Sequence, residues 1–271
     1  MANDIRIGII GAAGRMGQMN IRQVTETDGC IIAGATEGPG NPALGKDAGE
    51  LAGVGALGVP LIDDAAAMIA NVDAVIDFTV PEATVETARL AAQAGAALIA
   101  GTTGLTPEQE EEIVKAARHI PVVRAANMSV GVTLLAALTE QVASTLGIDY
   151  DIEILEMHHR HKVDAPSGTA LALGEAAARG RKVVLGEVKQ AVRDGYTGAR
   201  TPGDIGFATL RGGDIAGEHE VIFAADGERV ILSHKASSRQ VFAVGAVRAA
   251  LWTRNQPPGL YNMRNVLGFD S

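Results

Sequence analysis

Histidine and basic side chains gather in one short stretch of the chain. Residues 156–169, EMHHRHKVDAPSGT, hold three of the six histidines within four positions, together with Arg160 and Lys162. The whole chain has a formal net charge of −9, so this local positive charge could concentrate an anionic small molecule. Ser167 to Thr169 are expected to open a helix, whose free backbone N–H groups could hold a carboxylate.

Two other interpretations of this stretch stay open from the residues alone. A histidine-rich loop can be a solvated group of cations, and three imidazoles could bind zinc. Arg160 and Lys162 stand among the imidazoles and would repel a divalent cation, so zinc is the least favoured of the three. Lys162 is the best single candidate for an acid, because burial near other cations favours release of an ammonium proton.

A second stretch has the glycine spacing of a dinucleotide site. Gly11, Gly14 and Gly17 follow the apolar run Ile5–Ile10 and precede a helical stretch. Glycines would let the backbone approach a pyrophosphate at the N-terminus of that helix. Glu37 lies 20 residues after Gly17, where a carboxylate would accept hydrogen bonds from an adenine ribose. The G-x-x-G-x-x-G spacing differs from the usual G-x-G-x-x-G, and a structural turn is the alternative.

Two later turns also follow expected strands, at residues 101–103 and 125–128. In a parallel sheet both would open at the carboxyl edge, where ligands bind, although either alone could be an ordinary loop. His119, His219 and His234 are isolated in the sequence, and we expect them to be structural. Cys30, the only cysteine, is expected to be a buried apolar filler.

The elements that must position these residues alternate between strand and helix in the first half of the chain. Pro81 and Pro107 suit first helical positions, and Thr106 with Gln109 can form a capping box. Such repeated β-then-α units predict a doubly wound parallel sheet with right-handed crossovers, an α/β fold of the Rossmann type. Strands are expected at Ile5–Ile10, Cys30–Ala35, Ala74–Phe78, Ala97–Ala100 and Pro121–Ala125.

The pattern changes after about residue 130. Asp151–His158 alternates in the manner of a strand with one face covered, and Asp226-Gly227 is a strong signal for a hairpin turn within 220–233. This half predicts an α+β domain with an open sheet, mixed or antiparallel. The other expected elements are helices over 130–146, 170–178 and 239–252 and a strand over 207–210.

Composition limits the classes of function. The chain has 271 residues, just under two average domains, and its acidic balance and nine aromatic residues argue against nucleic-acid binding. No apolar run reaches the ~18 residues that a membrane helix needs. Met1–Ile5 lacks the basic region of a signal peptide, and a single cysteine cannot form an intrachain disulfide. We therefore expect a soluble, cytoplasmic protein that binds neither nucleic acid nor membrane.

Together these residues resemble the dihydrodipicolinate reductase family of lysine and diaminopimelate biosynthesis. The resemblance spans nearly the whole chain, and the HHRHKxDAPSGT string is its most specific part. The matching segments are residues 11–17, 101–103, 156–169, 205–210 and 234–239.

The resemblance implies a fold, a reaction and an assembly. A dinucleotide-binding domain would span residues 1–129 and be completed by 240–271, while residues 130–239 would bind substrate and build a homotetramer. Hydride from NADH or NADPH would reach C4 of a cyclic imine derived from 4-hydroxy-tetrahydrodipicolinate, and a proton would reach C3. The alternatives are another NAD(P)-dependent dehydrogenase of a small dicarboxylate or imino acid, a catalytically silent NAD(P)H-binding protein, and a zinc hydrolase.

The family's site residues carry over by position. His158 is implied in proton transfer and Lys162 as proton donor, while His159, Gly168 and Thr169 would bind substrate carboxylates. No metal site is implied. The implied cofactor-binding residues are Gly11, Ala12, Ala13, Gly14, Arg15, Met16, Glu37, Gly101, Thr102, Thr103, Ala125, Ala126, Asn127 and Met128.

One position departs from the family's pattern. Many members that use both cofactors carry an arginine directly after the ribose carboxylate, and this chain has Gly38 there. Glu37 would repel the 2′-phosphate of NADPH, and Arg15 is the only nearby cation that could offset this. The sequence therefore predicts that NADH is preferred or at least equal.

Overall fold

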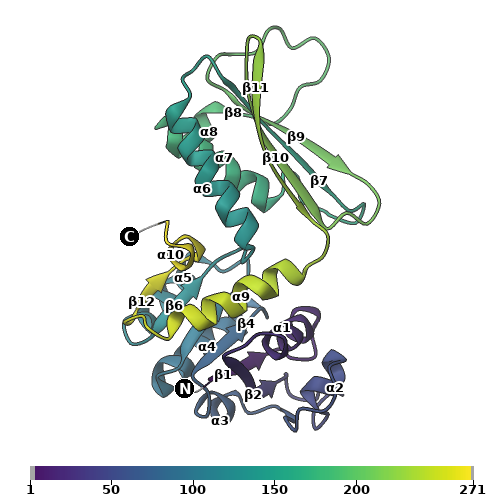
Figure 1. The fold of residues 1–271 in the computed structure, drawn as a ribbon, viewed down its shortest axis with the longest axis vertical. Helices are drawn as coiled ribbons and strands as arrows, with labels where there is room; N and C mark the ends of the chain where they lie inside the picture. The colour runs from purple at the N-terminus through teal and green to yellow at the C-terminus, as the bar shows by residue number, and fades with distance from the viewer. Residues whose placement is uncertain (1–3, 270–271) are drawn as a thin grey trace. The chain divides into compact units, whose positions relative to one another are not determined.

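Short apolar strands alternate with helices in the first of two units into which the computed structural model divides (Figure 1). Unit 1 comprises residues 1–130 and 240–271, and unit 2 comprises residues 131–239. The structure describes residues 4–269. Residues 1–3 and 270–271, at the two ends of the expected dinucleotide-binding domain, lie outside these residues, and so does part of Met1–Ile5, the segment expected not to be a signal peptide.

The sheet of unit 1 has seven strands, all parallel, in the order β3-β2-β1-β4-β5-β6-β12. Strand order reverses beside β1, as in doubly wound dinucleotide-binding folds. The strands are β1 (Ile5–Ile10), β2 (Cys30–Thr36), β3 (Leu61–Ile62), β4 (Ala74–Asp77), β5 (Ala97–Ala100), β6 (Pro121–Arg124) and β12 (Gly259–Tyr261).

Helices cover both faces of this sheet, which explains why its strands are apolar throughout. Ile7, Ile76 and Ile99 lie in one core with α1 (Arg15–Thr25), α2 (Ala48–Ala52), α9 (Gln240–Thr253) and α10 (Met263–Leu267). Val75 and Leu98 lie in a second core with α3 (Ala65–Ile69), α4 (Pro81–Ala94) and α5 (Pro107–Ala116). The capping box expected at Thr106 and Gln109 is confirmed at the start of α5.

Unit 2 contains a five-stranded sheet in the order β11-β10-β7-β9-β8. Two of its strand pairings are antiparallel and two are parallel, so the sheet is mixed. The chain passes from β7 to β9 through α7, and such a crossover makes the two strands parallel. The elements are α6 (Val130–Thr145), β7 (Asp151–His158), α7 (Gly168–Arg181), α8 (Leu185–Val188), β8 (Lys189–Gln190), β9 (Ile205–Arg211), β10 (Gly217–Ala225) and β11 (Glu228–Ala236).

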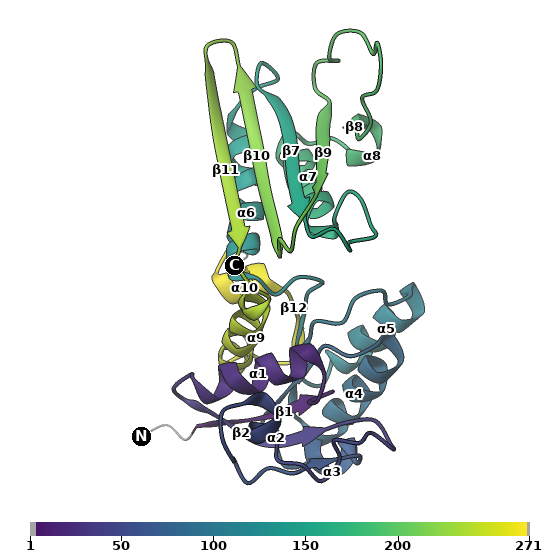
Figure 2. The same ribbon diagram turned by 90° about the vertical axis from the view of Figure 1, so that its right-hand side faces the viewer.

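The helices α6 and α7 pack on one face of the mixed sheet (Figure 2). Side chains of β7 alternate, so that Ile152, Ile154, Glu156 and His158 are buried while the residues between them are only partly covered. The expected fold class is confirmed for both units. No helix among residues 4–269 is both long and apolar enough to cross a membrane.

Candidate functional site

The glycine-rich loop joins β1 to α1 at the carboxyl edge of the parallel sheet. Gly14 is the N-cap of α1 and offers no side chain to the first N–H groups of the helix. Those groups have no acceptor within the helix and remain available to an anion. A Cβ at Gly17 would overlap the Gly11 carbonyl oxygen and lie 2.7 Å from Ala12 Cα. Gly17 therefore allows α1 to begin directly against the loop.

Glu37 follows β2 and lies beside this loop. Its carboxylate accepts hydrogen bonds from the backbone N–H of Ala13 at 2.8 Å, from that of Gly38 at 3.2 Å and from Asn41 Nδ2 at 3.2 Å. Two predicted cofactor-binding segments are thus in direct contact. The three donors fix the carboxylate beside the start of α1.

The other two predicted cofactor turns follow β5 and β6, so they open at the same edge of the sheet as the glycine-rich loop. Thr102 is buried, and its hydroxyl accepts a hydrogen bond from Thr84 Oγ1 at 2.7 Å. Met128 is buried, whereas Thr103 and Ala126 are exposed. This arrangement fits a dinucleotide, because a helix N-terminus, a ribose-directed carboxylate and two further turns share one edge.

Asp77, at the end of β4, lies next to the predicted turns and is a candidate residue that the sequence analysis missed. It is fully buried, and its Oδ1 accepts hydrogen bonds from the backbone N–H and the hydroxyl of Thr79 at 2.8 and 2.6 Å. Thr102 Oγ1 also lies 3.5 Å from Oδ1. Asp77 therefore holds together the turns that follow β4 and β5. An Asp-x-Thr at the end of an expected strand was the available signal, since Asp commonly accepts from the backbone two residues on.

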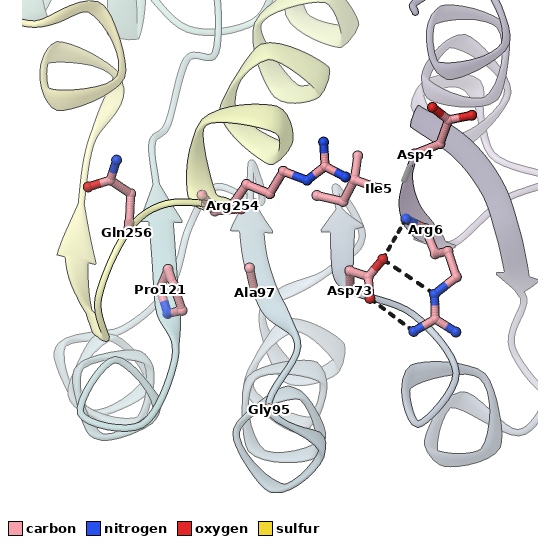
Figure 3. A pocket seen from close by; sticks show the side chains of 10 residues that line it. Asp4, Ile5, Arg6, Asp73, Gly95, Ala97, Pro121, Arg254 and Gln256 are labelled. Atoms are coloured by element: carbon pink, nitrogen blue, oxygen red, sulfur yellow. Dashed lines mark hydrogen bonds and ion pairs between the residues drawn. The ribbon is translucent and has the colours of Figure 1, made fainter. Parts of the chain in front are cut away.

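A cavity of about 630 Å³ lies at the opposite edge, where β1, β5 and β6 begin (Figure 3). Arg6 and Asp73 form a bidentate ion pair in its wall. Asp4 and Arg254 add one charge of each sign, so the formal charges of the lining cancel. Ligands of open α/β sheets bind at the carboxyl ends of the strands, so this cavity is not the expected dinucleotide site.

In unit 2, the candidate residues lie around the end of β7. His158 Nδ1 is 2.6 Å from Glu156 Oε2, and both side chains are buried on the helix-covered face. In the strand register, Glu156 stands between Thr209 on β9 and His219 on β10, while His158 pairs with Arg211. The predicted string is therefore completed by residues that lie about fifty positions away in the chain.

Glu156 collects most of the polar contacts of this site. Arg211 donates to both of its oxygens, at 2.7 and 2.9 Å, and the Ser167 backbone N–H donates to Oε1 at 3.0 Å. Burial opposes ionisation, but these donors together with His158 keep the pKa of Glu156 below its ordinary value. The Glu156 carboxylate is therefore charged at neutral pH.

His158 is neutral in this environment. Burial lowers its pKa below the ordinary value; Glu156 opposes the effect, while Lys162 and Arg211 reinforce it. A carboxylate can only accept a hydrogen bond, so the single proton of the neutral ring is on Nδ1 and Nε2 is an acceptor. A Cβ at Gly217 would lie only 3.0 Å from Nε2, so the glycine leaves room for the ring.

Lys162 lies in the loop after β7, and its side chain is 20% exposed. Its Nζ forms an ion pair with Asp164 Oδ1 at 2.7 Å, and this bond lowers the pKa of Asp164 below its ordinary value. The direct partner of Lys162 is therefore a carboxylate, which the sequence analysis did not predict. Arg211 Nη2 donates to the Asp164 carbonyl oxygen at 2.6 Å and so ties the loop to β9.

The predicted helix start after this loop is confirmed. Ser167 is the N-cap of α7, its hydroxyl accepts from the Ala170 N–H, and Gly168 and Thr169 occupy the first helical positions. Gly168 is exposed and His159 is partly buried. Glu156 contacts His158 directly and also accepts from the N–H of Ser167, the N-cap of α7. The predicted residue His158 and the predicted carboxylate-binding positions at the start of α7 therefore lie in one region of unit 2.

His219 is not isolated, contrary to the expectation from sequence. Its ring packs edge-on against His158 with centroids 5.1 Å apart, and its Nε2 is 3.0 Å from Ser167 Oγ. Only 3% of the residue is exposed. Burial, reinforced by His158, lowers the pKa of His219 to about 4. Among residues 4–269, no three His, Cys, Asp or Glu side chains come together as metal ligands would.

Comparisons with known proteins match both units. A family model described as "Dihydrodipicolinate reductase, N-terminus" covers residues 5–128, and one described as "Dihydrodipicolinate reductase, C-terminus" covers residues 131–267. The 4-hydroxy-tetrahydrodipicolinate reductase of Chelativorans sp. (strain BNC1) is 56% identical over 268 residues, which cover 98% of this chain and 97% of the relative. That of Brucella abortus (strain 2308) is 56% identical over 264 residues, covering 97% and 98%.

A solved structure confirms the fold independently. The dipicolinate-bound dihydrodipicolinate reductase from Paenisporosarcina sp. TG-14 superposes with a TM-score of 0.77 at 23% sequence identity. The superposition covers 96% of this chain and 97% of that protein.

Proposed function

The chain belongs to the dihydrodipicolinate reductase family, and on this premise we propose that it reduces 4-hydroxy-tetrahydrodipicolinate, by way of dihydrodipicolinate, to tetrahydrodipicolinate. The enzyme is an NAD(P)H-dependent oxidoreductase of lysine and diaminopimelate biosynthesis. The observation that carries the proposal is 56% identity, over nearly the full length of both proteins, to a reductase of this name.

We assign dinucleotide binding to residues 1–129 together with 240–271. The first-turn N–H groups of α1, with residues 11–16 around them, hold the pyrophosphate, and Glu37 holds the adenosine ribose. Residues 101–103 and 125–128 line the nicotinamide side. The support is the common edge of the sheet and the Ala13–Glu37 hydrogen bond, which joins two of these segments.

We assign substrate binding to residues 130–239. When bound, the reduced nicotinamide would supply a hydride to C4 of dihydrodipicolinate, the conjugated imine that remains after the substrate has lost water. Charge then moves to the ring nitrogen and C3, where the cations of the basic string stabilise it and Lys162 gives a proton to C3. His159 and the N–H groups of Gly168 and Thr169 hold the substrate carboxylates, as a helix N-terminus can. His158, neutral with Nε2 free, contributes a hydrogen-bond acceptor.

For the cofactor, we propose that NADH binds as tightly as NADPH or more tightly. Glu37 is held in place by three donors, and a fixed carboxylate repels the 2′-phosphate of NADPH. At the next position, the space around a Cβ on Gly38 is open to 4 Å, so no neighbouring group occupies the place of the arginine found in dual-cofactor members.

For the assembly, we propose a homotetramer built on the face of the unit 2 sheet opposite α6 and α7. We call this the outer face, and it carries Leu155, Met157, Leu210, Ile222 and Ile231. Leu210 and Ile231 are 46% and 50% exposed. Exposed apolar side chains on an open sheet face are typical of a surface that another subunit covers.

The function is tested by mixing the purified protein with substrate made in situ by the synthase that condenses pyruvate with aspartate semialdehyde. Absorbance of the reduced nicotinamide is followed in parallel with NADH and NADPH. Substrate-dependent oxidation at an ordinary enzymatic rate is expected, on the order of 10 s⁻¹. Protein that binds NADH but oxidises neither cofactor would instead be a silent binder or a dehydrogenase of another imino acid.

A further inference from the structure

Glu156 is a buried carboxylate that contacts several residues of the candidate site in unit 2. It is 1% exposed and bonds to four other residues: His158, Ser167, Thr209 and Arg211. We propose that Glu156 is a positioning residue for the reaction, which holds His158 as the tautomer with its proton on Nδ1 and fixes it against the N-terminus of α7. The proposal rests on the proposed function and assigns a new role within that site.

Stability alone does not account for a charge at this place. Burying a carboxylate and a guanidinium costs desolvation energy, and a buried ion pair can often be replaced by apolar residues of similar volume without loss of stability. On the same strand, Ile152 and Ile154 fill the equivalent inward positions with aliphatic side chains. Packing alone therefore does not require a negative charge at residue 156, and one of the groups that this charge faces is His158.

The contacts of Glu156 couple the imidazole to the expected substrate site. Oε2 faces His158 Nδ1, while Oε1 accepts from the N–H of Ser167, the residue that caps α7. Arg211 binds both oxygens, so the carboxylate cannot rotate freely between these two partners. Movement of His158 relative to Gly168 and Thr169 is restricted as a result.

This arrangement also divides the chemical roles of His158 and Lys162. A neutral ring whose proton is committed to Glu156 has no proton on Nε2 to give, so the donor to C3 is Lys162 and His158 is an acceptor. The charged and titratable groups that face His158 are Glu156 on its own strand, Lys162 in the loop, Arg211 on β9 and His219 on β10.

Glu156→Gln tests the charge with almost no change of shape. A glutamine that still accepts from Ser167 presents its NH₂ group to His158 Nδ1, so the ring must move its proton to Nε2 or turn away. A wrong tautomer in a catalytic carboxylate–histidine pair can lower kcat by up to about 10⁴-fold. Because His158 is expected to accept a hydrogen bond rather than to transfer a proton, we expect a smaller effect here. The kcat of Glu156→Gln should fall about 10²-fold, and the acidic limb of its pH profile should shift.

A double-mutant cycle separates positioning from a general structural effect. Glu156→Gln, His158→Gln and the double variant are compared in kcat with saturating NADH. If Glu156 acts through His158, the double variant is no slower than His158→Gln alone. Fold reductions that multiply would overturn the proposal. Glu140→Gln, which removes the carboxylate partner of Arg179 at the other end of α7, is the control and is expected to leave kcat unchanged.

A second readout does not depend on turnover or on a variant that folds. The ¹⁵N shifts of the His158 ring in the wild-type protein at about pH 7.5 report which nitrogen carries the proton, and we expect Nδ1. A proton on Nε2, or near-normal kcat of Glu156→Gln in an active preparation, would overturn the proposal. If the wild-type chain does not reduce the substrate, the proposed function fails, and the ring signals still decide whether Glu156 sets the tautomer.

Discussion

Acidification should destabilise unit 2 through His219. This side chain has a pKa of about 4 in the folded protein against an ordinary value of 6.5, because burial disfavours its charged form. The unfolded chain therefore binds a proton first as the pH falls, and stability present above about pH 6.5 is lost progressively down to about pH 4. The difference between the folded and unfolded pKa values corresponds to about 3 kcal/mol in the free energy of unfolding, and about 2 kcal/mol of this is lost by pH 5.

The comparison that isolates this contribution is wild type against His219→Asn. Burial also lowers the pKa values of His158 and His234, so both proteins will lose stability in acid, and only the difference between them reports His219. Urea unfolding, followed by far-UV circular dichroism at about pH 7.5 and pH 5, measures that difference. We expect the loss between the two pH values to be about 2 kcal/mol smaller in the variant. Equal losses in the two proteins would refute the assignment of a buried, neutral His219.

Four further predictions concern the site and the assembly. Lys162→Ala should lower kcat about 10²-fold or more in the coupled assay, and near-normal turnover would exclude Lys162 as the proton donor. Calorimetry should find that NADPH binds no more tightly than NADH. Gly38→Arg should change the ratio of the two dissociation constants about tenfold in favour of NADPH, since open space surrounds a Cβ at residue 38. Gly17→Ala should lower the free energy of unfolding, measured in urea, by about 1–3 kcal/mol and weaken NADH binding, because its Cβ meets backbone atoms that cannot rotate away. The matched variant Gly38→Ala should change neither quantity, because a Cβ there meets nothing within 4 Å. Ile231→Lys should convert the expected tetramer into smaller species in sedimentation velocity, and an unchanged sedimentation coefficient would remove the outer face as the interface.

Local signals predicted the elements that position the site. Ile5–Ile10, Ala97–Ala100 and Asp151–His158 were expected from patterning and are strands with those bounds, and the turn at Asp226-Gly227 joins β10 to β11. These features depend on residues that are close in sequence. Buried parallel strands are continuously apolar, half-covered strands alternate, and Asp-Gly suits the backbone of a hairpin turn.

The remaining parts of the site depend on strand register, which patterning does not supply. Arg211 reaches Glu156 only because β9 runs parallel to β7 with His158 opposite Arg211, and His219 approaches because β10 pairs Glu156 with His219. A shift of one residue in either pairing would turn these side chains to the other face. Short β12 and α10, which complete unit 1, were also missed, because segments of three and five residues contain too few positions to show a period.

The order in which the chain leaves the ribosome has a consequence for how the two units mature. Ala246 and Ala250 of α9 belong to the same core as Ile7. Strand β12 pairs with β6, so unit 1 needs residues from both ends of the chain. Residues 131–239 are complete before α9 has been synthesised. Unit 2 can therefore fold while the part of the unit 1 sheet that α9 and α10 cover is still exposed. Apolar surface that is exposed during this interval favours aggregation and chaperone binding.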